Sequence, residues 1–146
     1  MFKPDVILLV QDEETDALLI ERAIRKLRWS NPVKHLPDGE QAIAYLGRQS
    51  PFASNEPRPG LVLLDLKMPG CSGMDVLSWA RHQPDLDKVP IVICTGSADE
   101  HFRDEAIKRG ADGYVVMPAT FDEMTRLLAE LARFLPDAAK GAPSVA

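Results

Sequence analysis

Cysteine is scarce in this 146-residue sequence, and the two cysteines form no recognised metal or redox motif. Cys71 and Cys94 are widely separated, and no CxxC spacing occurs. Two reduced thiols are typical of a cytosolic protein, whereas small secreted domains depend on dense disulfides. The sequence therefore predicts neither a disulfide framework nor a cysteine-based metal centre.

Long apolar runs and clusters of basic residues are also missing. The first apolar segment, residues 5–10, is far shorter than the roughly 20 residues of a membrane span and has no signal-peptide pattern around it. The 22 acidic and 17 basic residues give a net charge of −5, and no Lys/Arg cluster is long enough to follow a phosphate backbone. We expect a cytoplasmic protein that binds neither membranes nor nucleic acids.

The overall composition is that of one globular domain. Hydrophobic residues make up 45% of the chain and charged residues 27%, a balance typical of folded proteins with a single core. Residues 48–60 contain three prolines and no periodicity, so we expect a long surface loop there. We predict one domain over residues 1–136 and a flexible Ala/Pro/Gly-rich tail over residues 137–146.

Apolar strand-like segments alternate with amphipathic helical segments along the chain. The strands are predicted at residues 5–10, 33–36, 61–65, 91–95 and 113–116. A helix is predicted after each strand. The first continues to Arg28, the second spans residues 40–46, and the third carries Met74, Leu77 and Ala80 on one face. The fourth ends at Gly110, and the fifth stops at Pro136. Ser97 with Glu100 and Thr120 with Glu123 match the capping-box spacing that marks a helix start. The alternation predicts an α/β fold with a five-stranded parallel sheet, doubly wound by right-handed crossovers.

Three polar residues stand at the ends of predicted strands. The run LVLLDLKMPG, residues 61–70, places Asp65 at the end of a strand that is apolar enough to be buried on both faces. Asp12 follows the first strand, and Thr95 ends the fourth. Sites of doubly wound sheets lie at the carboxyl ends of the strands. We therefore expect these three side chains to converge.

Four motifs, in this order and spacing, resemble the receiver domain of bacterial two-component response regulators. They are QDE at residues 11–13, LVLLDLKMPG with the following CSGMDVL at 61–77, ICTGSA at 93–98, and GADGYVVMP at 110–118. The resemblance extends from Val6 to about Leu135 and implies the flavodoxin-like (βα)5 receiver fold. The long loop before residue 61 further resembles the single-domain regulators that pair with phytochrome-type histidine kinases.

The resemblance implies a phosphorylation site at Asp65. This residue matches the family's acceptor of a phosphoryl group from a kinase histidine, and Mg²⁺ would be held by Asp12, Asp65 and the backbone carbonyl of Lys67. Thr95 and Tyr114 match the family's switch residues. A hard divalent cation prefers oxygen ligands and neutralises the charge that develops during phosphoryl transfer, so the implied cofactor agrees with the residue types.

Two positions depart from the family pattern. Gln11 stands where a second acidic residue is usual, so we expect weaker Mg²⁺ binding unless Glu13 reaches in. Met117 stands where the family has a lysine, and a thioether cannot form a salt bridge with a phosphoryl oxygen. Three interpretations stay open. They are a phosphorylatable receiver with weakened switching, a degenerate receiver that signals by binding alone, and a receiver in which the side chain of Lys67 supplies the missing cation.

Two competing functions fit the sequence less well. A phosphatase of the haloacid-dehalogenase type needs a second acid two residues after its aspartate, and Lys67 stands there. A flavin module needs a Ser/Thr/Gly-rich phosphate loop after the first strand, where QDEE would repel phosphate. We expect a non-enzymatic, single-domain response regulator with no attached output domain. Its expected partners are a histidine kinase, a downstream target or phosphotransfer protein, and a second copy bound through the fourth and fifth helices.

Overall fold

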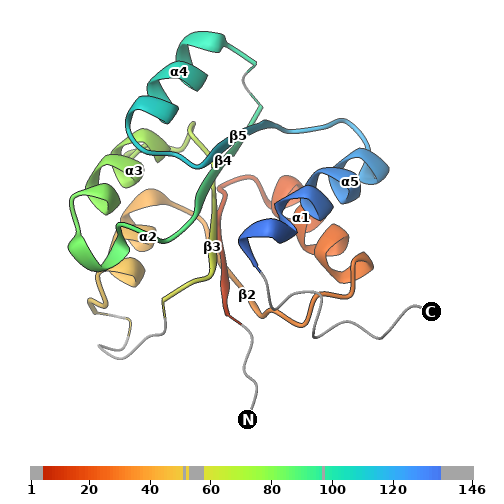
Figure 1. The fold of residues 1–146 in the computed structure, drawn as a ribbon, viewed down its shortest axis with the longest axis horizontal. Helices are drawn as coiled ribbons and strands as arrows, with labels where there is room; N and C mark the ends of the chain where they lie inside the picture. Colours follow the sequence, from red (N-terminus) through yellow and green to blue (C-terminus); the bar gives the residue numbers. More distant parts are fainter. Residues whose placement is uncertain (1–4, 51, 53–57, 97, 136–146) are drawn as a thin grey trace.

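The computed structural model describes residues 5–50, 52, 58–96 and 98–135, which form one sheet between two layers of helices (Figure 1). The predicted tail over residues 137–146 lies outside the described residues. So does the centre of the predicted loop over residues 48–60. Both remain predictions.

The sheet contains five parallel strands in the order β2-β1-β3-β4-β5. They are β1 (Ile7–Val10), β2 (Val33–Leu36), β3 (Leu61–Leu64), β4 (Ile91–Thr95) and β5 (Gly113–Val116). The chain moves outward from β1 to β2 and then returns past β1 to β3, so the winding reverses between β1 and β3. Doubly wound proteins bind ligands at the carboxyl ends of the strands beside such a reversal. The predicted flavodoxin-like α/β fold is confirmed.

Helices cover both faces of the sheet. One face carries α1 (Glu14–Lys26) and α5 (Phe121–Leu131), and the other carries α2 (Gly39–Leu46), α3 (Gly73–Arg81) and α4 (Glu100–Lys108) (Figure 1). Two 3-10 turns, η1 (Pro84–Leu86) and η2 (Ala132–Phe134), follow α3 and α5. A separate hydrophobic core lies under each helix layer. None of the described helices has the length and apolar character that crossing a membrane requires.

The three central strands are buried on both faces. Every residue of β1, β3 and β4 is buried, which explains their continuous apolar sequences, whereas the edge strands β2 and β5 are partly exposed. Polar side chains can enter this layer without a large desolvation cost only where a strand ends. Asp65 accordingly comes directly after β3, and Thr95 is the last residue of β4.

The predicted strands and the first helix agree with the structure except at their ends. β1 begins at Ile7 rather than residue 5, and β3 ends at Leu64, one residue before the predicted end. α1 ends at Lys26 rather than Arg28. Backbone at position 28 adopts a positive φ of 58°, which is incompatible with a continuing right-handed helix.

Helix starts were predicted correctly for α5 and incorrectly for α4. The hydroxyl of Thr120 accepts a hydrogen bond from the amide of Glu123, as the capping pattern predicts. The predicted start after Ser97 is wrong, because α4 begins at Glu100 and the carboxylate of Asp99 caps it. Ser97 itself lies outside the described residues. A reciprocal capping box between Ser72 and Asp75, which the sequence interpretation missed, begins α3.

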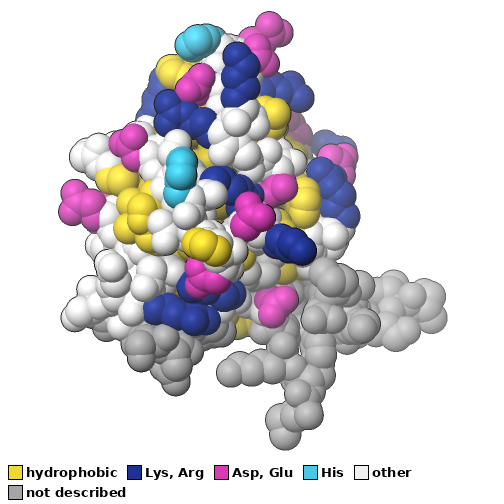
Figure 2. Space-filling model, turned by 60° about the vertical axis from the view of Figure 1, so that its left-hand side comes forward, with side chains coloured by type: hydrophobic (Ala, Val, Ile, Leu, Met, Phe, Trp, Pro, Cys, Tyr) yellow, Lys and Arg dark blue, Asp and Glu magenta, His cyan; other side chains and the backbone are white. Residues whose placement is uncertain are grey.

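α4 is the helix least embedded in the domain. Of its nine residues, all of which the structure describes, Ala106 alone is fully buried, whereas each other α-helix buries three or four residues. In Figure 1, α4 lies at the upper edge of the molecule. Figure 2 shows charged side chains of both signs around it, with hydrophobic side chains in small separate patches. Few apolar contacts therefore oppose a displacement of α4.

Arg81 forms a network of hydrogen bonds at the end of the sheet opposite Asp65. Its guanidinium donates to the carbonyls of Gly110 and Val89 over 2.9 and 3.0 Å, and forms an ion pair with Asp112 at 2.8 Å. Asp112 also accepts a hydrogen bond from the amide of Ile91 over 2.8 Å. This network ties α3 to the starts of β4 and β5, on the side of the sheet away from Asp65.

Gly73 allows α3 to begin directly against the end of β3. A Cβ atom at this position would lie 2.0 Å from the backbone oxygen of Asp65. The amide of Gly73 donates to the carbonyl of Leu66 over 3.0 Å, which holds the loop against the strand end. Gly70 supplies the turn with a φ of +75°, a conformation that residues with a Cβ rarely adopt. The position of Asp65 thus depends on two glycines downstream of it.

Gly73→Ala is expected to lower the free energy of unfolding by roughly 1–3 kcal/mol, because the added methyl group forces backbone to move. Gly96→Ala is the matched control, since a Cβ at position 96 meets no atom of the described residues within 4 Å beyond its chain neighbours. Urea denaturation of both variants beside the wild type measures the difference. An unchanged transition for Gly73→Ala would show that α3 can shift away from β3 at no cost.

Candidate functional site

Asp12, Asp65 and Thr95 lie together at the carboxyl ends of the central strands. β1 and β3 pair with Val10 beside Leu64, and the amide of Asp65 donates to the carbonyl of Val10 over 3.0 Å. Thr95 ends the neighbouring strand β4. Asp12 and Thr95 both influence the carboxyl pKa of Asp65. The structure therefore brings together the three polar strand-end residues.

Asp65 carries a buried carboxyl whose charged form is disfavoured. The residue is 8% exposed, and burial raises the pKa of its carboxyl above the ordinary value. The Thr95 hydroxyl and the backbone amides of Lys67 and Leu66 lower that pKa, and the charge of Asp12 raises it further. No positively charged side chain of the described residues is among the groups that shift this pKa. The carboxylate at Asp65 is thus poorly compensated and would favour a bound cation.

Two buried oxygens beside Asp65 have no hydrogen-bond partner within the described part of the chain. They are Oδ1 of Asp12 and Oγ1 of Thr95, which is 1% exposed. The Thr95 hydroxyl lowers the pKa of the Asp65 carboxyl but makes no well-formed hydrogen bond to a described group, so its oxygen stays unpartnered. A buried polar atom left in this way costs about 1–3 kcal/mol. Both oxygens are therefore available to a bound ion or group.

These oxygens fit Mg²⁺ better than a metal that needs a full protein cage. Mg²⁺ commonly binds through one or two carboxylates and keeps several waters. Asp12 and Asp65 provide two carboxylates, one with an unpartnered oxygen and the other desolvated. Among the described residues, no group of three or more His, Cys, Asp or Glu side chains could hold a metal. The donor set therefore suits a partly hydrated hard cation.

The side chain of Gln11 is already engaged in local structure. Its Oε1 accepts a hydrogen bond from the amide of Glu13 over 3.1 Å, and its backbone oxygen lies 2.8 Å from Nε2 of His35. Gln11 is 2% exposed, whereas the Glu13 side chain is on the surface. The side-chain amide of Gln11 therefore stabilises the start of α1.

Met117 packs against sulfur rather than presenting a charge to the site. The thiol of Cys94 donates to the Met117 sulfur over 3.1 Å, and the Met117 amide donates to the carbonyl of Thr95 over 2.7 Å. Burial, followed by the nearby carboxylates of Asp65 and Asp16, raises the pKa of the Cys94 thiol to about 12. Cys94 therefore stays protonated and able to donate. Met117 belongs to the core beneath α1 and α5.

Lys67 and Tyr114 lie on the opposite side of the sheet from that core. Lys67 is exposed, and its Nζ lies 5.6 Å from the centre of the Phe102 ring on α4. Tyr114, on β5, is partly buried and packs against the core beneath α2, α3 and α4. Both residues therefore link the site to the helices on this face.

The model of the response regulator receiver domain family matches residues 7–129 of the chain. The chain belongs to this family. The matched range includes all five strands and ends within α5, so the receiver domain and the described fold coincide.

Two related proteins illustrate the sequence similarity of this receiver. The probable methanogenesis regulatory protein FilR2 of Methanothrix harundinacea is 31% identical over 131 residues, which cover 90% of this chain and 83% of FilR2. The response regulator Rcp1 of Synechocystis sp. is 38% identical over 97 residues, which cover 66% of this chain and 65% of Rcp1. The receiver spans about half the length of the transcriptional regulators that it also matches.

Solved structures of phytochrome-associated response regulators share the fold of this receiver. The phosphorylated cyanobacterial phytochrome response regulator RcpA has a TM-score of 0.85 and 27% identity, covering 97% of this chain and all of RcpA. The Mn²⁺-bound form of Rcp1 has a TM-score of 0.81 and 30% identity, covering 90% of this chain and 94% of Rcp1. This receiver is therefore similar to regulators of the phytochrome-associated group.

Two contacts at this receiver's site were missed by sequence interpretation. One joins Lys67 to Phe102, and the other joins Cys94 to Met117. Each pair consists of residues from different elements, so spacing along the chain carries no direct signal for it. An aromatic residue in the first turn of α4 was the only hint of the first contact.

Asp65→Asn is expected to stabilise this receiver at pH 7 in metal-free buffer, because it removes a carboxylate that the folded state disfavours. The folded-state pKa of Asp65 lies above the unfolded value of 3.8. Wild-type stability should therefore rise as the pH falls between the two pKa values, and the advantage of Asn should vanish below 3.8. Urea unfolding in EDTA at pH 7 and near pH 3.5 tests this. A variant less stable than wild type at pH 7 would contradict it.

Proposed function

We propose that this receiver accepts a phosphoryl group from a histidine kinase on Asp65, with Mg²⁺ bound beside it. The observation that carries the proposal is the meeting of a desolvated, only partly compensated Asp65 carboxyl with the unpartnered Oδ1 of Asp12 at the reversal of sheet winding. A protein that only binds partners would be more stable with a neutral residue in place of either aspartate, because the two carboxylates repel each other. The receiver instead keeps both carboxylates where a cation and a phosphoryl group would bind.

Asp12, Asp65 and the backbone carbonyl of Lys67 are the groups that would hold Mg²⁺. When bound, Mg²⁺ supplies neutralisation of the negative charge on the transferring phosphoryl group. The solved Rcp1 structure contains Mn²⁺, a cation that also favours oxygen ligands, and this supports the assignment by similarity. Replacement of the usual second acid by Gln11 leaves one carboxylate fewer, so weaker cation binding remains our expectation.

The chemical step transfers phosphorus from nitrogen to oxygen. A carboxylate oxygen of Asp65 attacks the phosphorus of the kinase phosphohistidine, a P–O bond forms as the P–N bond breaks, and the imidazole leaves with the bond's electron pair. Asp65 suits this role because poor solvation leaves its oxygens unshielded by water. The buried Thr95 hydroxyl, which lacks a partner among the described residues, would then donate to a phosphoryl oxygen.

The proposed signal leaves the receiver by protein contact. The similarity to RcpA, a phytochrome response regulator, supports a phytochrome-type kinase as the phosphoryl donor. A cytoplasmic location is part of the same proposal. Thr95 ends β4 beside Asp65, and Tyr114 on β5 packs against the core that includes Ala106 of α4, so a switch would act through these two residues. The output partner would be a downstream target or a phosphotransfer protein. Residues 1–136 would act as the receiver, with residues 137–146 as its tail.

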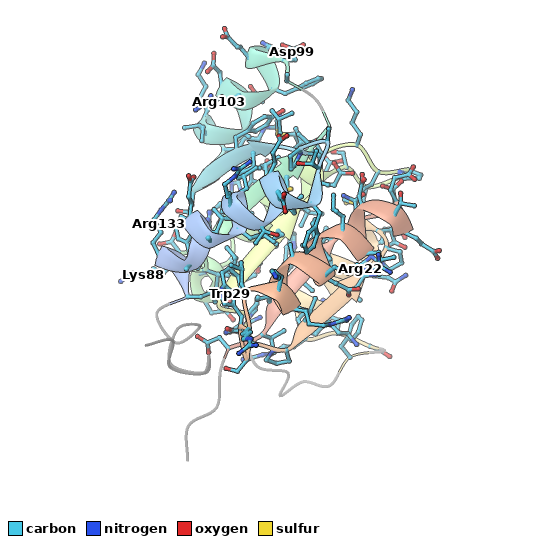
Figure 3. The ribbon with its side chains drawn as sticks, turned by 90° about the vertical axis from the view of Figure 1, so that its right-hand side faces the viewer. Arg22, Trp29, Lys88, Asp99, Arg103 and Arg133 are labelled. Carbon is cyan, nitrogen blue, oxygen red and sulfur yellow. The ribbon has the colours of Figure 1, made fainter. Side chains whose placement is uncertain are left out.

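The α4 and β5 surface is the proposed homodimer contact. Ile107 on α4 is 48% exposed and Val116 on β5 is 40% exposed. They line a hollow of about 520 Å³ together with Arg103 and Arg133. Figure 3 shows these two arginines projecting from the same side of the molecule. Apolar residues bordered by charge are typical of a docking patch.

The alternative is a degenerate receiver that binds partners without phosphorylation. Met117 favours it, because the residue lies in the core and offers no charge to a phosphoryl group. Engagement of Gln11 with Glu13 favours it as well. The two functions differ in one observable: only the phosphorylatable receiver forms an aspartyl phosphate.

Incubation with radiolabelled acetyl phosphate and Mg²⁺ should label the wild type, and EDTA should abolish the label. Asp65→Asn should remove labelling completely, and Asp12→Asn should slow it by at least about tenfold because a cation ligand is lost. Asp87→Asn is the control, since this exposed carboxylate follows η1 at the far end of the sheet. An unlabelled wild type would establish the degenerate receiver instead.

Ile107→Asp with Val116→Asp should weaken dimerisation of the phosphorylated receiver by at least about tenfold, because burying an unpaired carboxylate is costly. Sedimentation equilibrium with beryllofluoride and Mg²⁺ measures the association. Leu18→Asp is the matched control, because Leu18 is 43% exposed on α1, on the other face of the sheet. Equal effects of both charge insertions would assign the dimer contact elsewhere.

A further inference from the structure

The side chain of Lys67 connects the site to α4. Its backbone amide acts on the Asp65 carboxyl, so the residue begins beside the acceptor. Its Nζ lies 5.6 Å from the centre of the Phe102 ring, so the side chain ends on α4. Lys67 is exposed, and its long flexible stem allows the ammonium group to occupy more than one position.

The proposed phosphorylated site is short of positive charge. A phosphoryl group carries about −1.5 to −2 charges, Asp12 carries one more, and Mg²⁺ supplies two positive charges, so about half to one negative charge remains. Met117 cannot neutralise it, because a thioether has no charge and its sulfur contacts Cys94. A single ammonium group from a nearby residue would balance this remainder.

Space for movement lies next to Lys67. A cavity of about 160 Å³ separates the loop after β3 from α4, and Leu66, Lys67, Ser72, Met74 and Phe102 line it. The stem of Lys67 and the ring of Phe102 thus share an apolar cavity large enough for either side chain to shift. The ammonium group can leave the ring without displacing packed core atoms.

We infer that Lys67 is the cation that contacts the phosphoryl group on Asp65, and that it leaves the Phe102 ring to do so. The inference rests on the proposed phosphorylation of Asp65. Before phosphorylation, the ammonium group is held over Phe102 by a cation–π contact. After phosphorylation, the stronger charge-assisted contact with a phosphoryl oxygen replaces it. Lys67 therefore contacts the phosphoryl group directly and responds to the charge on Asp65.

This exchange couples Asp65 to α4. Of the α4 residues, all of which are described, Ala106 alone is fully buried, so the contacts of Phe102 with the core and with Lys67 are among those that hold the first turn of the helix. Its removal frees the ring of Phe102 to occupy the adjacent cavity. Phosphorylation would thereby change the position of α4 without the lysine that the family carries on strand five.

Beryllofluoride binding in saturating Mg²⁺, followed by ¹⁹F NMR, tests the inference on the full chain. Lys67→Met should weaken binding about five- to tenfold. A charge-assisted contact is lost, and the loss is partly offset because the variant has no cation–π contact to break. Its backbone carbonyl is retained, so Mg²⁺ binding alone should change little. Phe102→Leu should strengthen beryllofluoride binding about two- to fivefold, because the competing contact is gone.

Matched variants separate this role from a general loss of charge or packing. Lys34 forms the same kind of contact with Phe52, with Nζ 5.4 Å from the ring centre. Lys34→Met and Phe52→Leu should leave beryllofluoride binding unchanged. Adding Met117→Lys to Lys67→Met should restore much of the lost affinity, because a new ammonium group then replaces that of Lys67 from the end of β5.

The position of the ammonium group can be followed directly. The Cε protons of Lys67 should resonate upfield in the free protein, because the adjacent Nζ lies over the Phe102 ring, and should return to ordinary values when beryllofluoride binds. Those of Lys34 should not move. If wild type binds beryllofluoride and Lys67→Met binds it equally well, the Lys67 inference is wrong while the proposed function stands. If wild type binds no beryllofluoride and takes no label, both are wrong.

Discussion

Complete burial of β1, β3 and β4 is the constraint on which the rest of the structure depends. Strands covered by helices on both faces must be apolar along their whole length, so polar chemistry is confined to their ends. Reversal of the winding between β1 and β3 then puts the end residues Asp12 and Asp65 beside each other. Because α3 must also begin directly at that edge, Gly73 is required where the helix meets the strand.

The electrostatic consequence of this arrangement is a shortage of positive charge. Neutral contacts partly compensate Asp65, and Met117, whose sulfur contacts Cys94, brings no positive charge to the site. A receiver with this site can work only if cations come from elsewhere. A divalent ion and Lys67 are the two sources that we propose, and the side chain of Lys67 also contacts α4.

The fold could be predicted from the sequence because buried parallel strands are continuous apolar runs and helices have their own period. The start of α4 could not be predicted, because Ser97 and Asp99 are both acceptable helix caps by residue type. The structure uses the carboxylate of Asp99, the residue directly before the helix. Placement of Asp12, Asp65 and Thr95 followed from strand ends alone. The contacts of Met117 and Lys67 depend on how β5 and α4 pack against their neighbours, which spacing along the chain does not encode.

Within this one domain, the burial that holds α4 contributes much less free energy than the burial in the two cores. The cores beneath α1 and α5 and beneath α2 and α3 are built from fully buried side chains, each contributing roughly 1.5–3 kcal/mol when large. The buried methyl group of Ala106 contributes far less. A displacement of α4 would therefore cost little free energy, and the sheet that positions Asp65 would remain intact while the surface at α4 changes.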